Sequence, residues 1–185
     1  MAQTPSRFLA LLRGINIGGR NIIPKEALRQ CFEDLGFHSV RTYIQSGNIL
    51  FRSDRTTVKE LTEAIEHALS DRFSYEARAV VLSHRKYKSA VQAAPDGWGD
   101  DDTRRHNALF TLAGIKPKSV LAQLPPLRTD VDTVAIGPGA LFWSMSKEQL
   151  TTSALMKLPA APVYQQLTVR NHNTVFRLLE LFDEI

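Results

Sequence analysis

An alternating row of polar side chains is the clearest sign of chemistry in this sequence. Within residues 40–45, Arg41, Tyr43 and Gln45 alternate with a valine, a threonine and an isoleucine. Because successive side chains of an extended strand point to opposite faces, one face would carry a guanidinium, a phenol and an amide. Such a row suits an anion, a nucleobase or a partner surface, and it defines no particular reaction.

Two further polar residues, Asn48 and Arg52, fall on the next expected strand. RNA-recognition modules present aromatic side chains from the central strands of a sheet to stack on bases. The segment 46–53 lacks that signature, since Phe51 shares a face with Ile49. The alternative is that the polar face packs against the second half of the chain and hydrogen-bonds across that interface. A cleft between two halves would combine both interpretations, because ligand sites often lie in such clefts.

A glycine-rich loop at 14–21 has the Gly-x4-Gly spacing of a P-loop. A P-loop continues with Lys and then Ser or Thr, whereas this loop continues with Arg20 and Asn21. The next helix is expected to begin at Pro24, too late for its N-terminus to meet a phosphate directly. The loop is therefore not expected to be an ATPase-type P-loop.

A weaker hypothesis for the same loop is an anion nest formed by backbone amides. Arg13 and Arg20 flank the glycines, and Asn16 lies among them. The alternative is a flexible loop whose glycines satisfy turn geometry alone.

A third candidate is the segment Arg170-Asn-His-Asn173, which precedes the expected closing helix. Asn171 or Asn173 can cap that helix, and helix N-termini also attract anions. Arg170 beside this N-terminus would complete a phosphate or carboxylate pocket with the first half.

Standard catalytic and metal-binding patterns are absent from the sequence. There is no Gly-x-Ser-x-Gly and no His-Glu-x-x-His, and the five histidines are scattered. The acidic run 100–102 lacks the downstream Glu of a calcium loop and is expected to be solvated. We therefore expect no metal and no cofactor, and assign no catalytic residue.

The charge of the chain is unevenly distributed. The net charge is +4, and residues 1–55 carry eight Lys or Arg against four acids. Such an excess attracts polyanions, although a basic soluble surface would look the same. The single Cys31 excludes an internal disulfide framework, and its place on an apolar helical stripe predicts a core residue. Without a signal peptide or an apolar stretch of ~18 residues, a cytoplasmic protein that does not enter membranes is expected.

Apolar periodicity predicts an α+β fold made of two similar halves. The first half, 1–83, has the order β-α-β-β-α-β, with strands expected at 7–13, 40–45, 48–53 and 74–82. That order is the ferredoxin-like unit, a mostly antiparallel sheet with two helices. A connecting helix and polar loop cover 84–106. The second half, 107–185, repeats the order, with helices expected around 118–123 and 152–158 and an extra helix at the C-terminal end.

The chain resembles a known family over nearly its whole length, and three stretches carry the resemblance. They are Leu11-Leu-Arg-Gly-Ile-Asn16 with Gly18-Gly19, Arg41-Thr-Tyr-Ile-Gln-Ser-Gly-Asn48 and Thr168-Val-Arg-Asn-His-Asn-Thr174. The chain resembles the bacterial proteins of domain of unknown function family 1697. The resemblance implies two ferredoxin-like halves and assigns no activity. The family commonly has Trp at the position of His172, so an aromatic stack there would be weaker in this chain.

These observations predict binding of an anionic ligand, either a nucleotide or a nucleic acid, on the polar sheet face and in the cleft between halves. Arginines would pair with phosphate, Tyr43 would stack or hydrogen-bond, and amides would orient the ligand. The candidate binding residues are Arg13, Asn16, Arg20, Arg41, Tyr43, Gln45, Asn48, Arg52, Arg170, Asn171 and Asn173. Two alternatives remain open: an enzyme acting on a phosphorylated small molecule in the same cleft, or a structural module without a ligand. The oligomeric state is left undetermined.

Overall fold

The computed structural model describes residues 5–16, 21–44 and 47–185. The chain forms two compact units, one made of Met1–Tyr87 with Leu178–Ile185 and the other of Lys88–Arg177. Each unit contains its own four-stranded antiparallel sheet. Across the described ranges, no helix is long and apolar enough to cross a membrane.

The first unit has the element order that apolar periodicity predicts. Its elements are β1 (Ser6–Arg13), α1 (Lys25–Asp34), β2 (His38–Tyr43), β3 (Asn48–Ser53), α2 (Val58–Phe73) and β4 (Arg78–Ser83). The strands pair in the order β2-β3-β1-β4, and every pairing is antiparallel. Strand β4 begins later than expected, because α2 runs to Phe73 and ends at Ser74 with a left-handed backbone.

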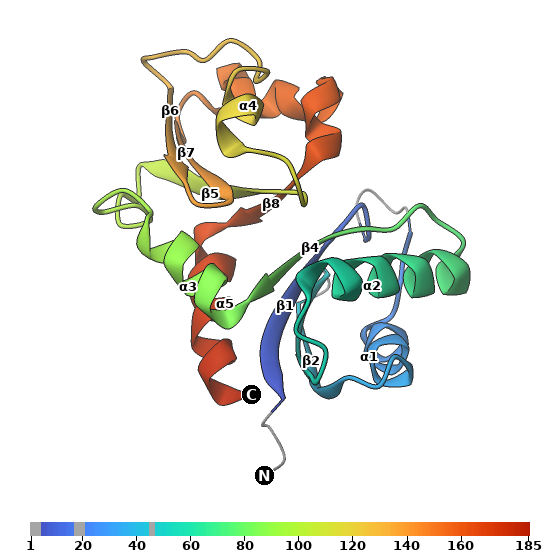
Figure 1. Cartoon of the computed structure of the whole chain (residues 1–185). Helices are drawn as coiled ribbons and strands as arrows, with labels where there is room; N and C mark the ends of the chain where they lie inside the picture. Colours follow the sequence, from blue (N-terminus) through green and yellow to red (C-terminus); the bar gives the residue numbers. More distant parts are fainter. Residues whose placement is uncertain (1–4, 17–20, 45–46) are drawn as a thin grey trace. The chain divides into compact units, whose positions relative to one another are not determined.

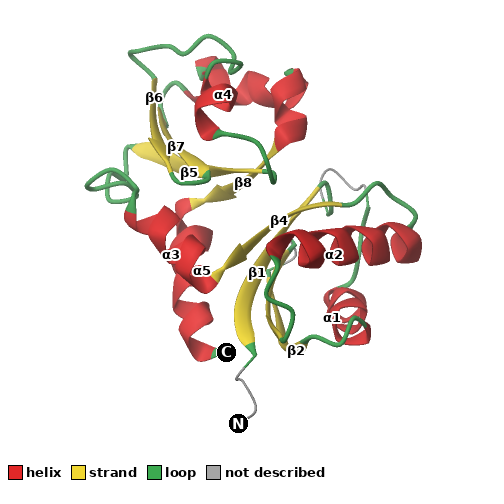
Figure 2. Ribbon diagram, in the orientation of Figure 1, coloured by secondary structure: helices red, strands yellow, loops and turns green. Residues whose placement is uncertain are grey.

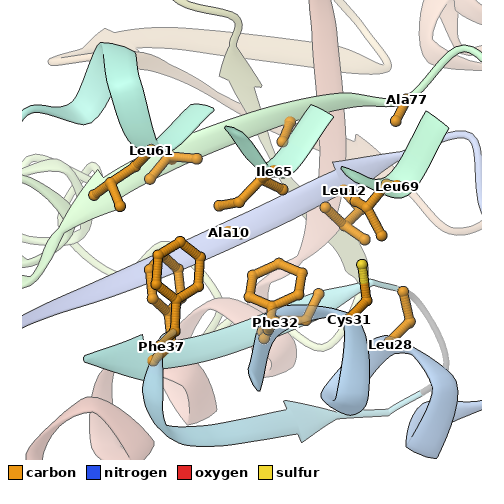
Figure 3. Packing of buried hydrophobic residues seen from close by; sticks show 14 of the residues in the cluster. Ala10, Leu12, Leu28, Cys31, Phe32, Phe37, Leu61, Ile65, Leu69 and Ala77 are labelled. Atoms are coloured by element: carbon orange, nitrogen blue, oxygen red, sulfur yellow. The ribbon is translucent and has the colours of Figure 1, made fainter. Parts of the chain in front are cut away.

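Helices α1 and α2 cover one face of this sheet (Figure 1). Alternate residues of β1 and β3 meet the apolar stripes of both helices, and Figure 3 shows Phe32, Leu61 and Ile65 among the packed side chains. The rings of Phe37 and Phe51 stack at a centroid distance of 4.6 Å. Cys31 lies in this core at 2% exposure, as its position on the helical stripe predicts.

The opposite face of the same sheet is also apolar and covered. Leu9, Leu11 and Leu50 are fully buried there, in alternation with the residues that meet α1 and α2. The first turn of α3 (His84–Gln92) and the last turns of α5 (His172–Glu184) belong to this unit. Tyr87 and Phe182 of these helices are buried with their ring centroids 5.6 Å apart.

The second unit repeats the strand arrangement (Figure 2). Its elements are β5 (Arg104–Thr111), α4 (Pro117–Leu121), β6 (Asp132–Gly137), β7 (Ala140–Ser146), β8 (Leu167–Asn171) and the first turns of α5. The strands pair in the order β6-β7-β5-β8, all antiparallel. The α+β class and the division into two β-sheet halves are confirmed.

The helix expected around 152–158 differs from the prediction. The chain forms three 3-10 helices there, Leu150–Thr152, Ala154–Ala160 and Pro162–Gln166. Pro159 and Pro162 lack the N–H that an α-helical ladder needs, so short 3-10 turns replace it. The Ser153 hydroxyl caps the middle helix by accepting a hydrogen bond from the Leu155 amide at 3.1 Å.

A buried carboxylate ties these 3-10 turns to the sheet. Asp132 Oδ1 accepts hydrogen bonds from Trp143 Nε1 at 3.0 Å and from the Ser153 hydroxyl at 2.6 Å. Asp132 Oδ2 accepts from the backbone amides of Ala154 at 3.0 Å and Arg128 at 3.2 Å. Burial raises the pKa of this carboxyl, but the four hydrogen bonds together lower the pKa below its usual value.

We expect Asp132→Asn to lower the free energy of unfolding by about 1–3 kcal/mol at neutral pH, because the new amide NH₂ faces donors. The folded pKa of Asp132 is depressed, so its stabilisation exists above the unfolded pKa of about 3.9 and is lost as pH falls through the folded value. The gap between wild type and variant should therefore narrow in acid. Urea denaturation at several pH values measures it.

Asp130→Asn is the matched control, since this exposed carboxylate two residues away forms an ion pair with Arg128 at the surface. It should leave stability nearly unchanged. A stability gap for Asp132→Asn that is constant with pH would contradict the role of the ionised carboxylate.

Candidate anion-binding pocket

The two arginines of the predicted polar strand face contact residues 184 and 185 of the first unit, at the end of α5 and directly after it. Arg41 forms an ion pair with Glu184, and both side chains stay nearly half exposed. Arg52 donates to the carbonyl oxygens of Ile185 at 2.7 Å and Pro5 at 3.0 Å. These contacts give both guanidiniums acceptors from the chain itself.

Arg7 makes the same kind of contact, although no motif in the sequence singles it out. Its guanidinium donates to the carbonyl oxygen of Phe182 at 2.7 Å and lies 3.7 Å from the Asp183 carboxylate. Each of the strands β1, β2 and β3 therefore carries an arginine that contacts residues 182–185. Cationic groups at carbonyls of a helix C-terminus are favourable, because those carbonyls lack intrahelical partners.

The remaining candidates on this face shape the turn between β2 and β3. Asn48 is buried and donates its side-chain amide to the Tyr43 carbonyl at 3.1 Å, while Tyr43 itself is half-buried. Gln45 lies outside the described residues. The amide of Asn48 thus braces a hairpin in this structure.

The ends of the glycine-rich loop are joined by asparagines. Asn16 Oδ1 accepts from the Ile23 amide at 2.9 Å, and the Asn21 side chain donates to the Gly14 carbonyl at 2.8 Å. Arg13, the last residue of β1, is half-buried. Arg20 lies outside the described residues.

Gly47 joins the turn between β2 and β3 to the start of the glycine-rich loop. Its carbonyl accepts from the Leu12 amide at 2.8 Å, and its φ is +72°. A Cβ on Gly47 would lie 2.8 Å from Leu12 Cβ and 2.9 Å from Ile15 Cδ1. The turn between β2 and β3 is therefore packed directly against the entry to the glycine-rich loop.

The second unit contains a pocket of about 620 Å³ where β5 begins and β7 and β8 end. Register pairing places Asn107 of β5 opposite Asn171 of β8, and Arg105 opposite Met145 of β7. The turn 99–102 and the first residues of α5 complete the polar wall, while Leu155 and Met156 supply apolar surface. A volume of this size is typical of a small-molecule site.

The pocket has an excess of positive charge. Three cations line it, Arg104, Arg105 and Lys147, against the two acids Asp101 and Asp102. Within the described part of the chain, Arg105 and Lys147 have no ion pair or side-chain hydrogen bond. The guanidinium of Arg104 is held by the carbonyl oxygens of Val131 and Ser144 at 3.0 and 2.9 Å.

One of the acids is already satisfied by its own turn. The hydroxyl and amide of Thr103 donate to the Asp101 carboxylate at 2.6 and 2.9 Å. These hydrogen bonds hold the pKa of Asp101 below its usual range, so the group is ionised at neutral pH. Its charge is turned to Thr103 rather than to Arg105 or Lys147.

The N-terminus of α5 lies at the same pocket. Asn171 caps this helix, since its side-chain oxygen accepts from the Thr174 amide at 2.9 Å, and His172 and Asn173 form the first turn. The positive end of the helix dipole adds to the field of the cations. Of the predicted residues, Asn171 and Asn173 therefore line a pocket together.

Arg170 lies apart from these two asparagines. It is buried at 7% exposure, and its guanidinium donates to the Thr168 hydroxyl at 2.7 Å and the Val169 carbonyl at 2.8 Å. Strand alternation directs it to the face opposite Asn171, and it is not part of the pocket lining.

A smaller cavity of about 380 Å³ adjoins this pocket and shares Asp101, Arg104 and His106 with it. His106 is buried, with Nδ1 2.8 Å from the Ser144 hydroxyl and Nε2 3.1 Å from the Asp101 carbonyl oxygen. A carbonyl only accepts, so Nε2 carries the hydrogen. In the neutral ring, Nδ1 then accepts from Ser144.

Sequence reasoning misses Arg105, His106, Ser144 and Lys147. His106 and Ser144 are 38 residues apart, and strand register alone places them opposite each other. The acidic run 100–102 beside a pair of arginines is the one local signal, and taken alone it indicates a solvated loop. The pairing of β5 with β7 brings residues of that loop into the lining of a pocket.

Substitution of Gly47 and of Gly14, both in the first unit, separates the steric constraint at a glycine from the conformational one. Gly47→Ala should cost about 1–3 kcal/mol more than Gly14→Ala, because it adds overpacking to the backbone strain that both share. At Gly14, φ is +75°, but no described atom lies within 4 Å of the place that a Cβ would take. Thermal or urea unfolding of both variants measures the difference. Equal losses would contradict the close packing of the two loops.

Comparison with known proteins places the chain in a family. A solved structure of a conserved bacterial protein from Streptococcus pneumoniae superposes with a TM-score of 0.85 at 29% identity, covering 96% of this chain and 98% of that one. No curated protein matches the sequence. The family model described as "Protein of unknown function (DUF1697)" matches residues 6–142. The chain therefore belongs to the DUF1697 family of proteins of unknown function.

Proposed function

We propose that this protein binds a small organic anion of nucleotide size, bearing phosphate or carboxylate, in the 620 Å³ pocket of the second unit. The observation that supports this proposal is the pair Arg105 and Lys147, two cations at one pocket without an acidic partner among the described residues. Phosphate and carboxylate are the groups that such cations bind most strongly.

The surroundings favour an organic ligand over a bare inorganic ion. Leu155 and the exposed side chain of Met156 add apolar surface to the lining of the same pocket. The side-chain amides of Asn107 and Asn173 can orient polar groups of a ligand, since each has donors and an acceptor. The anionic group would lie between Arg105, Lys147 and the first turn of α5.

The polar strand face of the first unit supports a different role. Arg41 and Arg52 contact Glu184 and Ile185, and Leu50, the cross-strand partner of Arg41, is fully buried. These contacts favour the structural alternative for that face. Binding of nucleic acid there stays an alternative that the same experiment tests.

The test is calorimetric titration with ATP, ADP and inorganic phosphate as probes. We expect wild type to bind at least one nucleotide, more weakly as salt increases. The double variant Arg105→Gln/Lys147→Gln should weaken that binding at least tenfold, because each charge-assisted hydrogen bond contributes about 1.5–3 kcal/mol. Lys118→Gln, which removes an exposed charge from α4, is the control and should bind as wild type does.

Two results would overturn the proposal. One is nucleotide affinity that is equal in the double variant and in Lys118→Gln. The other is binding of single-stranded RNA, followed by fluorescence anisotropy, that is lost in Arg41→Gln/Arg52→Gln and kept in the double variant. That second result would move the anion site to the sheet face of the first unit.

A further inference from the structure

The geometry points to a second activity in the second unit: Ser144 is a nucleophile activated by His106, suited to an ester or thioester of a small carboxylic acid. The Ser144 hydroxyl, the His106 ring and the Asp101 carbonyl oxygen form a chain of hydrogen bonds of 2.8 and 3.1 Å. Nucleophile, base and a group that orients the base are the three parts that covalent hydrolysis requires.

The proton positions suit the reaction. The Asp101 carbonyl holds His106 in the tautomer with hydrogen on Nε2, which leaves Nδ1 free of hydrogen to accept the proton of Ser144. As the Ser144 oxygen bonds to the acyl carbon, its proton moves to Nδ1, and the carbonyl electron pair moves to oxygen. Collapse breaks the bond to the leaving group, which takes the proton from Nδ1.

Water completes the cycle by the same route. A water molecule attacks the acyl–serine ester, gives its proton to His106 Nδ1, and releases the carboxylic acid as the Ser144 oxygen recovers that proton. The Asp101 carbonyl is a positioning group in both steps. It stabilises the protonated ring less than a carboxylate would, so a slow hydrolase is expected.

The cavity beside Ser144 is lined by two candidate donors for a developing oxyanion, Trp98 and Arg104. The 380 Å³ cavity is lined by Trp98, Arg104, His106, Thr133, Phe142 and Ser144. Trp98 is 5% exposed, and within the residues that the structure describes its indole N–H has no acceptor. A buried donor without an acceptor is costly, and in the proposed reaction the indole N–H is the candidate donor to the oxyanion. The Arg104 guanidinium adds positive charge at the same cavity.

The plainer interpretation is that Ser144 and His106 are a cross-strand pair that satisfies a buried histidine. That interpretation accounts for the 2.8 Å contact but not for the adjoining cavity or the unsatisfied indole. The two interpretations differ in whether the Ser144 oxygen is reactive. This inference goes beyond ligand binding and does not depend on Arg105 or Lys147.

An alkyl fluorophosphonate probe tests reactivity directly. The Ser144 oxygen would displace fluoride from phosphorus and pass its proton to His106, leaving a phosphonylated serine. We expect wild type to gain one adduct, mapped by peptide mass spectrometry to Ser144, and Ser144→Ala to gain none. His106→Gln should slow labelling at least tenfold, whereas Ser146→Ala on the same strand should label at the wild-type rate.

Labelling of the wild-type chain decides the question even if His106→Gln does not fold. Absence of an adduct at Ser144, or an adduct only on other serines such as Ser146, would overturn the proposal. So would equal labelling rates of wild type and a folded His106→Gln variant, with folding checked by circular dichroism. A protein that binds nucleotide but is not labelled would keep the proposed binding function and lose this one.

Discussion

The need to cover the second face of the first sheet governs much of this structure. Helices α1 and α2 cover one face, yet Leu9, Leu11 and Leu50 on the other are also fully buried. The last turns of α5 belong to the same unit and bury Phe182 in it, and burial of a side chain of this size contributes about 1.5–3 kcal/mol. Arg7 and Arg41 on the same sheet contact a carbonyl oxygen and acidic side chains of these turns.

The sequence predicts the features of the fold that depend on local patterns, but not those that depend on tertiary packing. Alternation in β1 and the helical stripe of α1 are local properties, so strands, helices and the buried Cys31 are predictable. The partner of Arg41 is not, because Glu184 is 143 residues away and only tertiary packing brings it there. A polar row on a strand has the same pattern whether its partner is a ligand or another part of the chain.

In the second unit, by contrast, several of the residues that line the pocket carry no sequence motif. Arg105, His106 and Lys147 lie in segments without a recognisable motif, and the pairing of β5 with β7 and β8 assembles them around a pocket. The apolar side chains of this sheet, among them Leu109, Leu141 and Trp143, pack in the core. The polar groups lie at the strand ends, outside that core. The centre of the sheet is thus a scaffold, and its end carries the chemistry.

The buried thiol under α1 has a practical consequence. Burial raises the pKa of Cys31, so the native thiol is protonated at neutral pH and shielded from reagents. It is also the single cysteine of the sequence. A cysteine introduced at any exposed position would therefore be the one fast-reacting thiol, and the protein can accept a fluorophore or spin label at a chosen site without first removing a native residue.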